Sequence, residues 1–333
     1  MSSHILGIDL GGTKVLAAVL DAEGHILARA RAKTQAWRDD EEVFRTIAQS
    51  GRRAIEKAGI DPAEIAAVGI GAPGPIDFDT GYIIETANLG FKNFPLGPRL
   101  AEEFNRPTIV ENDVNAGLYG EFKAGAARGA TEVLGVFIGT GIGGGLILNG
   151  ALYRGFSTGA GEVGHIIVRA GGPRCGCGNR GCFEAVASRT AISRDIRNEN
   201  KRRGRKARSG RLGKQDDLLS GKELKADYDS GDELVRKIIH SAAKSIGIGI
   251  GSILNLLGVE MVVLGGGVIE AFGDVFVDRI RRATRDIAFD INFKKVRIVR
   301  AELGDDAGVI GAAMLARVSL ESSTRKDTKP ASG

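Results

Sequence analysis

Residues 6–24 read LGIDLGGTKVLAAVLDAEG, and residues 134–150 read LGVFIGTGIGGGLILNG. Each stretch consists of an apolar run, a glycine turn and a second apolar run, which predicts two strands joined by a tight connection. The two stretches align with their glycine turns in register. We therefore predict an internal duplication in which each half of the chain opens with the same hairpin. A chance match between glycine-rich segments is the alternative.

Strands and helices are predicted to alternate through both halves of the chain. The first half is predicted to contain strands at 5–10, 14–21, 25–32, 66–71 and 108–111 and helices at 41–58 and 96–104. The second half is predicted to contain strands at 261–264 and 296–299 and helices near 232–257, 274–289 and 306–319. This alternation predicts an α/β fold whose sheets are covered by helices, with a cleft between two lobes.

The composition is that of a globular protein. The chain has 333 residues, of which 43% are hydrophobic and 26% charged, so disorder and a fibrous structure are excluded. No cationic lead precedes the short apolar run that Asp9 interrupts, so we expect no secretory signal and a cytoplasmic location. The uncharged stretch 246–259 is shorter than the roughly 20 residues of a membrane span, so we expect no membrane partner.

The net charge of +5 comes from one segment, 201–214, which contains eight Lys/Arg residues and no acid. Without these eight, 38 of the 46 basic residues remain against 41 acidic ones. The segment has no interleaved aromatic residues and no RNA-binding signature, so we interpret it as a solvated loop or helix extension and expect no nucleic-acid partner.

All three cysteines lie within eight residues, and a histidine precedes the first of them by ten residues. His165, Cys175, Cys177 and Cys182 have the chemistry of a tetrahedral zinc site, because zinc favours thiolate and imidazole ligands. Four protein ligands leave no position for a catalytic water, so the predicted Zn²⁺ is structural. Buried or redox-active cysteines are the alternative; the odd number in a glycine-rich loop argues against it.

Glycine turns follow the first predicted strand of each half, at 9–14 (DLGGTK) and 139–145 (GTGIGGG), and a third lies at 265–267. Backbone N–H groups reach phosphate oxygens where no side chain intervenes, and the threonine and lysine of the first turn add a hydroxyl and a charge. Asp9 is a candidate contact for a hydrated Mg²⁺. Together the turns indicate a nucleotide, although a hairpin alone would explain either of the first two. Neither of these two matches the Walker pattern.

Asp113 lies between a predicted strand and a predicted helix in TIVENDVNAG. A carboxylate at a strand end can accept the proton of a substrate hydroxyl as its oxygen attacks a γ-phosphate. Aspartate is also a common helix N-cap. The spacing alone leaves both roles open.

Glu162, His165 and Glu184 flank the cysteine cluster and would present two carboxylates and an imidazole to the hydroxyl groups of a polyol. A histidine that binds zinc through one ring nitrogen keeps the other for a ligand hydroxyl. Alternatively, Glu162 and Glu184 orient the zinc ligands.

These motifs resemble those of the ROK family (repressors, open reading frames and sugar kinases). The matching segments are DLGGTK (9–14), GAPGPID (71–77), ENDVNAG (111–117), GTGIGGG (139–145), GEVGH (161–165), CGCGNRGC (175–182) followed by Glu184, and VLGGGV (263–268). The resemblance covers residues 5–318. It implies a two-lobed, actin-like ATPase fold of the ribonuclease-H type, and a homodimer as the assembly. The implied parts are a small lobe at 1–113 joined by the last helix at about 304–319, a large lobe at 114–303 with the zinc loop at 165–182, and a flexible tail at 320–333.

The resemblance also implies a role for each candidate residue. Asp113 matches the catalytic base. The implied sugar-binding residues are Asn88, Asn112, Asp113, Glu162, His165 and Glu184. The implied phosphate contacts are Gly11, Gly12, Thr13, Lys14, Thr140 and Gly141, and those on the adenosine side are Gly266 and Gly267. The implied zinc ligands are His165, Cys175, Cys177 and Cys182.

The implied activity is transfer of the γ-phosphate of Mg·ATP to the 6-hydroxyl of a hexose, as a glucokinase does. Mannose, fructose, N-acetylmannosamine and N-acetylglucosamine fit the same residues, and polyphosphate is an alternative donor. The family also contains sugar-sensing repressors, which resemble this chain with a helix-turn-helix module in front. Because the first phosphate turn here begins at Asp9, we expect an enzyme.

Overall fold

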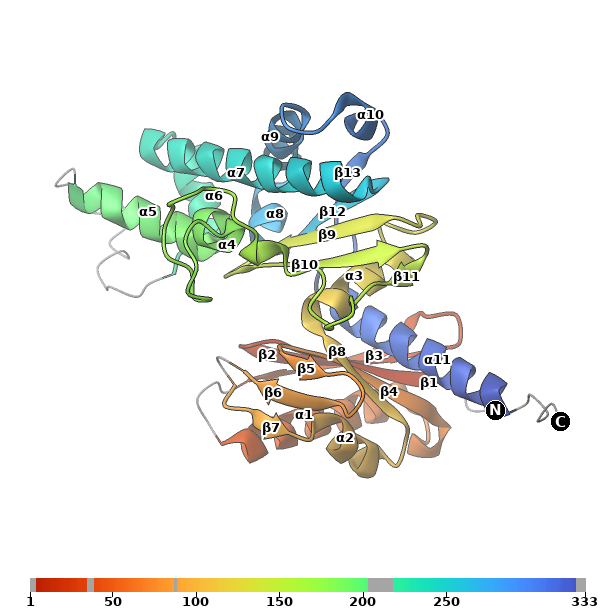
Figure 1. The fold of residues 1–333 in the computed structure, drawn as a ribbon. Helices are drawn as coiled ribbons and strands as arrows, with labels where there is room; N and C mark the ends of the chain where they lie inside the picture. Colours follow the sequence, from red (N-terminus) through yellow and green to blue (C-terminus); the bar gives the residue numbers. More distant parts are fainter. Residues whose placement is uncertain (1–3, 35–38, 87–88, 203–217, 328–333) are drawn as a thin grey trace. The chain divides into compact units, whose positions relative to one another are not determined.

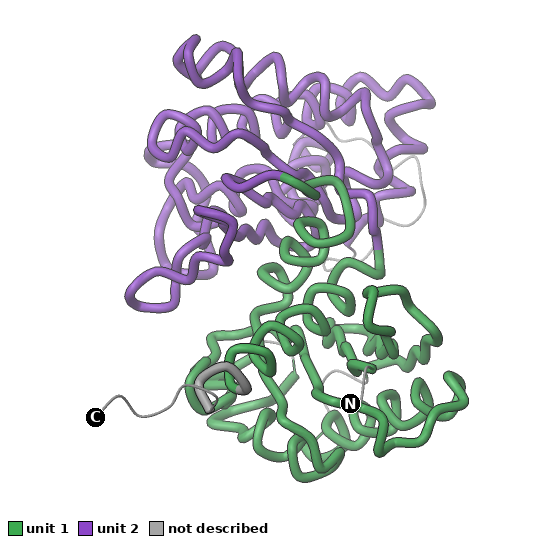
Figure 2. The backbone as a smooth tube through the Cα atoms, turned by 90° about the vertical axis from the view of Figure 1, so that its right-hand side faces the viewer, with its two compact units in different colours: residues 1–129, 305–333 green, residues 130–304 purple. Residues whose placement is uncertain are grey.

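The computed structural model describes residues 4–34, 39–86, 89–202 and 218–327 (Figure 1). It divides into two compact units (Figure 2). Unit 1 comprises residues 1–129 and 305–333, and unit 2 comprises residues 130–304. Unit 1 therefore contains both ends of the chain.

Unit 1 is built on a five-stranded sheet with the order β3-β2-β1-β4-β8. These strands are β1 (His4–Leu10), β2 (Lys14–Leu20), β3 (Ile26–Lys33), β4 (Ile65–Ala72) and β8 (Thr108–Asn112). β2 runs antiparallel to β1 and β3, whereas β1, β4 and β8 are parallel. β1, β2 and β4 are buried along most of their length, which explains their continuous apolar sequences.

Helices cover both faces of this sheet. They are α1 (Asp40–Ala58), α2 (Leu96–Phe104), α3 (Asp113–Ala124) and α11 (Ala307–Asp327), with short 3-10 turns η1 (Pro62–Glu64) and η3 (Gly304–Asp306). α1 packs on β2 and β3, and α11 packs on β1, β4 and α3 (Figure 1). A small antiparallel sheet is formed by β5 (Ile76–Asp77), β6 (Tyr82–Glu85) and β7 (Lys92–Phe94).

Unit 2 is built on a second five-stranded sheet, with the order β11-β10-β9-β12-β13. Its strands are β9 (Val133–Ile138), β10 (Ile142–Leu148), β11 (Ala151–Leu152), β12 (Met261–Gly265) and β13 (Arg297–Arg300). β10 runs antiparallel to β9 and β11, and β9, β12 and β13 are parallel. The strand order and directions repeat those of unit 1, and three residues separate the first two strands in both units. The predicted internal duplication is thus confirmed in the topology.

The helices of unit 2 enclose a core formed with its sheet. They are α4 (Phe183–Ala187), α5 (Arg189–Arg202), α6 (Gly221–Asp229), α7 (Glu233–Leu257), α8 (Gly267–Phe272), α9 (Asp274–Arg285) and α10 (Asp290–Phe293), with the 3-10 turn η2 (Val163–His165). α7 is the central helix, and it packs against α4, α5 and α9. Throughout the described segments, no helix has both the length and the hydropathy of a transmembrane span.

Two helix ends differ from the sequence-based expectation. The helix predicted at 274–289 ends at Arg285, because Asn255 of α7 bonds the Ile287 carbonyl and the Phe289 N–H and so replaces helical hydrogen bonds there. The last helix continues to Asp327, beyond the predicted end at residue 319. Ser322 and Ser323 donate hydrogen bonds to carbonyls four residues earlier, so their hydroxyls are satisfied within the helix.

Candidate functional site

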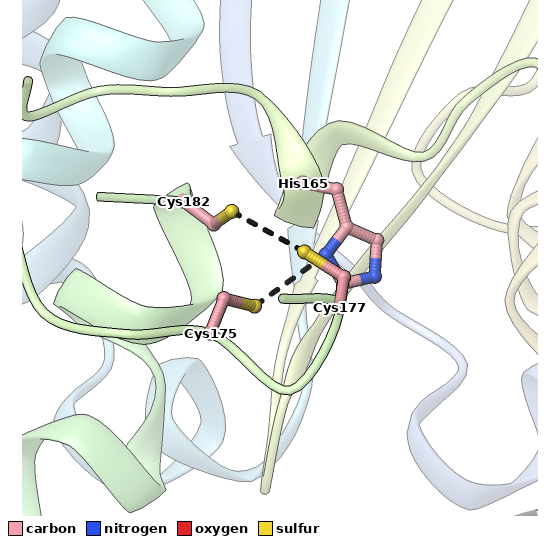
Figure 3. Close-up of side chains that lie close together, drawn as sticks. All are labelled: His165, Cys175, Cys177 and Cys182. Carbon is pink, nitrogen blue, oxygen red and sulfur yellow. Dashed lines mark hydrogen bonds between the residues drawn. The ribbon is translucent and has the colours of Figure 1, made fainter. Parts of the chain in front are cut away.

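The predicted zinc ligands lie together in unit 2 (Figure 3). One ligand atom from each of His165, Cys175, Cys177 and Cys182 lies within 4.8 Å of all the others. The Cys175 Sγ is 3.7 Å from the His165 Nδ1, and the Cys177 Sγ is 3.6 Å from the Cys182 Sγ. Three sulfurs and one imidazole nitrogen at this spacing fit a tetrahedral Zn²⁺, for which thiolates and imidazole are suitable ligands.

The cysteine loop is shaped by its own backbone. The Cys175 N–H donates to the Asn179 carbonyl (2.8 Å), and the Gly178 N–H donates to the Cys175 carbonyl (3.1 Å). A backbone hydrogen bond from Asn179 lowers the pKa of the Cys177 thiol to about 7, and burial raises the pKa of the Cys182 thiol to about 12. The loop therefore gathers thiols of very different acidity, and a bound divalent cation would favour the thiolate form of each.

His165 turns its Nδ1 toward the cysteines, and its Nε2 is the other ring nitrogen. The turn η2 that carries it begins after Glu162, whose carbonyl accepts from the His165 N–H (3.1 Å). Gly164 lets this turn lie directly on β10, because a Cβ there would overlap the Ile142 carbonyl oxygen. Glu162 and His165, both exposed, are thus fixed one turn apart beside the zinc ligands.

Glu184, which is also predicted to bind sugar, lies in α4, and its side chain contacts the end of the glycine turn that follows β9. Its Oε2 accepts a hydrogen bond from the Ile142 N–H (3.0 Å). The same oxygen occupies the space that a side chain on Gly141 would need. Since α4 directly follows Cys182, this carboxylate links the cysteine loop to the predicted phosphate turn.

The predicted phosphate and adenosine contacts of unit 2 lie at the ends of neighbouring strands. β9 and β12 are paired up to Phe137 and Gly265, so Thr140 and Gly141 follow one strand and Gly266 and Gly267 follow the next. Gly267 is the first residue of α8. The structure thus brings the unit 2 candidates for nucleotide binding to one edge of the sheet.

In unit 1, the turn containing Gly11, Gly12 and Thr13 connects β1 to β2. The Gly11 N–H donates to the Lys14 carbonyl (2.9 Å), which closes the turn. The Lys14 Nζ pairs with the Asp305 carboxylate, whose second oxygen accepts from the Arg31 guanidinium (2.6 Å). The Lys14 hydrogen bond is the main cause that lowers the pKa of Asp305. Lys14 is thus held at this turn by a residue 291 positions away.

Asp9 is half-buried at the end of β1 and lies against Gly308 of α11, where a Cβ would be 2.7 Å from the Asp9 Cγ. Burial, followed by repulsion from Asp113, raises the pKa of Asp9 to about 7, while Lys14 opposes the rise. This local excess of negative charge fits a hard cation such as Mg²⁺, whose preferred ligands are carboxylate and water oxygens.

Asp113 is the first residue of α3, but Asn112 is the N-cap. The Asn112 Oδ1 accepts from the Val114 N–H (3.0 Å) and the Asn115 N–H (3.2 Å). The N-cap role is therefore filled by its neighbour. The Asp113 Oδ1 also accepts from the Val114 N–H (2.9 Å). The half-buried Asp113 carboxyl lies near enough to Asp9 to raise its pKa.

Sequence analysis missed Glu111, which is 1% exposed directly before these residues. Its Oε1 accepts from the Asn115 Nδ2 (3.0 Å), so it stabilises the first turn of α3. Asp305 was missed because its partner Lys14 lies at the other end of the chain. Arg189, described below, was missed because a single arginine at a helix start gives no sequence signal.

The candidate residues belong to different units. Unit 1 contains Asp9, the turn 11–14, Asn112 and Asp113. Unit 2 contains Glu162, Glu184, the zinc ligands and the turns 140–141 and 266–267. Asn88 and most of the basic segment 201–214 lie outside the described residues.

Comparisons with known proteins identify the family of the chain. A family model described as "ROK family" matches residues 5–319. A glucokinase of Halalkalibacterium halodurans is 33% identical over 94% of both chains. The structure of a ROK family glucokinase from Streptomyces griseus, in complex with glucose and AMPPNP, superposes with a TM-score of 0.80 at 32% identity and covers 95% of this chain and 99% of that one.

A regulator is also similar to the chain. A xylose repressor of Caldicellulosiruptor bescii is 30% identical over 92% of this chain and 76% of its own length. The family match spans nearly the whole chain, and the glucokinase similarity extends over both compact units. By sequence and by fold, the chain belongs to the ROK family.

Proposed function

We propose that this chain is an ATP-dependent hexose kinase that transfers the γ-phosphate to the 6-hydroxyl of glucose. The observation that carries the proposal is the pair Asn112 and Asp113: the asparagine caps α3, and the aspartate stands at the same helix start without being its N-cap. The glucokinase relatives support glucose as the acceptor and ATP as the donor.

Asp113 acts as the general base. Its carboxylate accepts the proton of the attacking hydroxyl as the oxygen approaches the γ-phosphate in line, a role that contributes about 10²- to 10⁴-fold in rate. Glu111 and Asn115 hold the first turn of α3 in place, so the carboxylate keeps its position during the reaction. Phosphoryl transfer depends mainly on such positioning and on charge stabilisation.

The side chains that the ROK resemblance assigns to the sugar are proposed to bind its hydroxyls. Asn112 uses its Oδ1 for the helix cap, so its Nδ2 is the group proposed for the substrate, and Asn88 is proposed as a further contact. Glu162, Glu184 and the Nε2 of His165 are proposed as further partners of sugar hydroxyls. His165 and the three cysteines would hold a Zn²⁺, which would add rigidity and fix the orientation of the imidazole.

The nucleotide is bound by the glycine turns. The proposed phosphate contacts are Gly11, Gly12, Thr13, Lys14, Thr140 and Gly141, and the proposed adenosine contacts are Gly266 and Gly267. Asp9 would hold a hydrated Mg²⁺, which would neutralise phosphate charge.

A coupled ADP-release assay tests the proposal. We expect faster turnover with glucose than with mannose, fructose or the two N-acetylhexosamines. We also expect faster turnover with ATP than with polyphosphate as the donor. Activity confined to another sugar would refute the glucose assignment, and better use of polyphosphate would refute the donor. A gel shift at physiological salt tests the repressor alternative, which sequence-selective binding would support.

We also infer a cytoplasmic homodimer. Leu256, Phe289 and Ile291 are 81%, 71% and 68% exposed, and the segment that contains the last two is hydrogen-bonded to the end of α7 through Asn255. Large apolar side chains gathered in this way favour an interface. Light scattering should give a dimer for the wild type and a monomer for Phe289→Asp combined with Ile291→Asp. A wild-type monomer would contradict the inference.

A further inference from the structure

The glycine turn after β9 is held by the start of α5. The Arg189 N–H donates to the Gly139 carbonyl (3.0 Å), and the Thr190 Oγ1 donates to the Thr140 carbonyl (2.7 Å). Directly after the turn, the Ile142 N–H donates to Glu184. The backbone of this turn is therefore fixed before any ligand arrives.

The side chain of Arg189 extends along the same turn. Its Nη2 donates to the Thr140 Oγ1 (2.7 Å), while its Nε is buried and has no hydrogen-bond partner within the described part of the chain. Within the described residues no carboxylate contributes to its pKa, which burial alone shifts. Burial lowers the pKa of the guanidinium, and no opposing attraction offsets this effect.

A partly buried guanidinium whose one side-chain contact is a neutral hydroxyl is unfavourable unless an anion completes it. The side chains beside it, Thr140 and Thr190, are uncharged. Glu184, the carboxylate at the far end of the turn, is already engaged by Ile142. A ligand anion bound at this turn would pair with the guanidinium.

We propose that Arg189 binds the phosphate chain of the nucleotide and is a binding residue of unit 2 that the family motifs did not assign. The planar guanidinium suits phosphate oxygens, and the contact to Thr140 places it on the turn expected to receive them. The proposal rests on the kinase function argued above and deepens it, because it names the cation that this turn contributes.

Calorimetric titration of the purified full-length protein with ATP, ADP, adenosine and glucose tests the proposal. In Arg189→Ala, we expect the dissociation constants of ATP and ADP to rise about 10- to 100-fold, as for loss of a charged hydrogen bond. Those of adenosine and glucose should be unchanged. Arg189→Lys should be intermediate, since it keeps the charge without the planar fork. Arg194→Ala is the matched control, because this arginine of the same helix is paired with Asp195 and should behave as wild type.

Arg189→Gln separates charge from structure. It can still donate to Thr140, so its melting temperature should match the wild type while its ATP affinity falls and depends less on salt. The proposal is overturned if ATP binds the variants as it binds the wild type, or if adenosine affinity falls as much as ATP affinity. A wild type that binds ATP through Arg189 but phosphorylates no hexose would refute the kinase function and not this contact.

Discussion

Asn112 caps helix α3, and Asp113 beside it is the first residue within the helix. The Asn112 Oδ1 lies 3.0 Å from the Val114 nitrogen and 3.2 Å from the Asn115 nitrogen. Asp113 also contacts the backbone, because its Oδ1 accepts from the Val114 N–H (2.9 Å). The N-cap role, with two backbone N–H groups, belongs to Asn112, and this is the division between the two residues.

This division predicts opposite effects of two substitutions. Asn112→Ala removes the cap and should lower the free energy of unfolding by about 1 kcal/mol. Asp113→Asn keeps an acceptor oxygen for the Val114 N–H and removes the repulsion with Asp9, so it should not lower the melting temperature. Asn112→Ser is the control, because serine caps nearly as well. Calorimetric melting checks the three variants, and a loss of stability in Asp113→Asn equal to that in Asn112→Ala would show that Asp113 is structural.

Asp9 predicts a pH dependence near neutrality. Its pKa is raised from 3.8 to about 7 in the folded chain, so the folded state binds more protons than the unfolded state between these values. Stability should therefore fall as the pH rises through this window. Asp9→Asn removes the penalty, so its melting temperature should exceed that of the wild type at pH 8 and approach it at pH 5.

The same ionisation should affect catalysis, because only the carboxylate form of Asp9 suits Mg²⁺. We expect wild-type turnover to decline below about pH 7, because the Asp9 carboxylate takes up a proton there. If the melting temperatures of Asp9→Asn and the wild type changed in parallel with pH, the raised pKa of Asp9 would be contradicted.

The cysteine cluster predicts a metal requirement. Elemental analysis should find one Zn²⁺ per chain, and Cys182→Ser should lower both the zinc content and the melting temperature, because structural zinc contributes folding energy. We expect chelation to raise the KM for sugar more than the KM for ATP, since His165 belongs to both the zinc ligands and the sugar contacts. Full activity of zinc-free protein would exclude this role.

Glu184 predicts a link between the cysteine loop and the phosphate turn. Glu184→Ala leaves the N–H of Ile142 without its acceptor, which costs about 1–3 kcal/mol where the group is buried. The KM for ATP should therefore rise about tenfold or more. Glu184→Gln keeps an acceptor oxygen and should raise it less. Equal ATP kinetics in the wild type and both variants would show that the turn does not depend on this bond.

The sequence predicted most strands and helices well because their signals are local. The three opening strands, the glycine turns and the end of α1 at Gly59 follow from apolar runs and capping residues within a few positions. The zinc ligands were also predictable, since all of them lie within 18 residues of one another. The small sheet β5-β6-β7 was missed, because its strands are two to four residues long.

What the sequence did not predict depends on contacts between distant positions. Lys14 meets Asp305 across 291 residues, and Asn255 ends α9 from another helix. The choice between Asn112 and Asp113 as the cap could not be made from residue type, because both side chains cap well. Only the backbone geometry of α3 distinguishes them.

The most direct test of the account is a rapid-quench measurement of glucose 6-phosphate formed from labelled ATP in the first turnover. The account predicts rapid product formation by the wild type, and a rate about 10²- to 10⁴-fold lower in Asp113→Asn with unchanged affinity for glucose and ATP. Product formed by Asp113→Asn at the wild-type rate, or no sugar phosphate from the wild type, would contradict it.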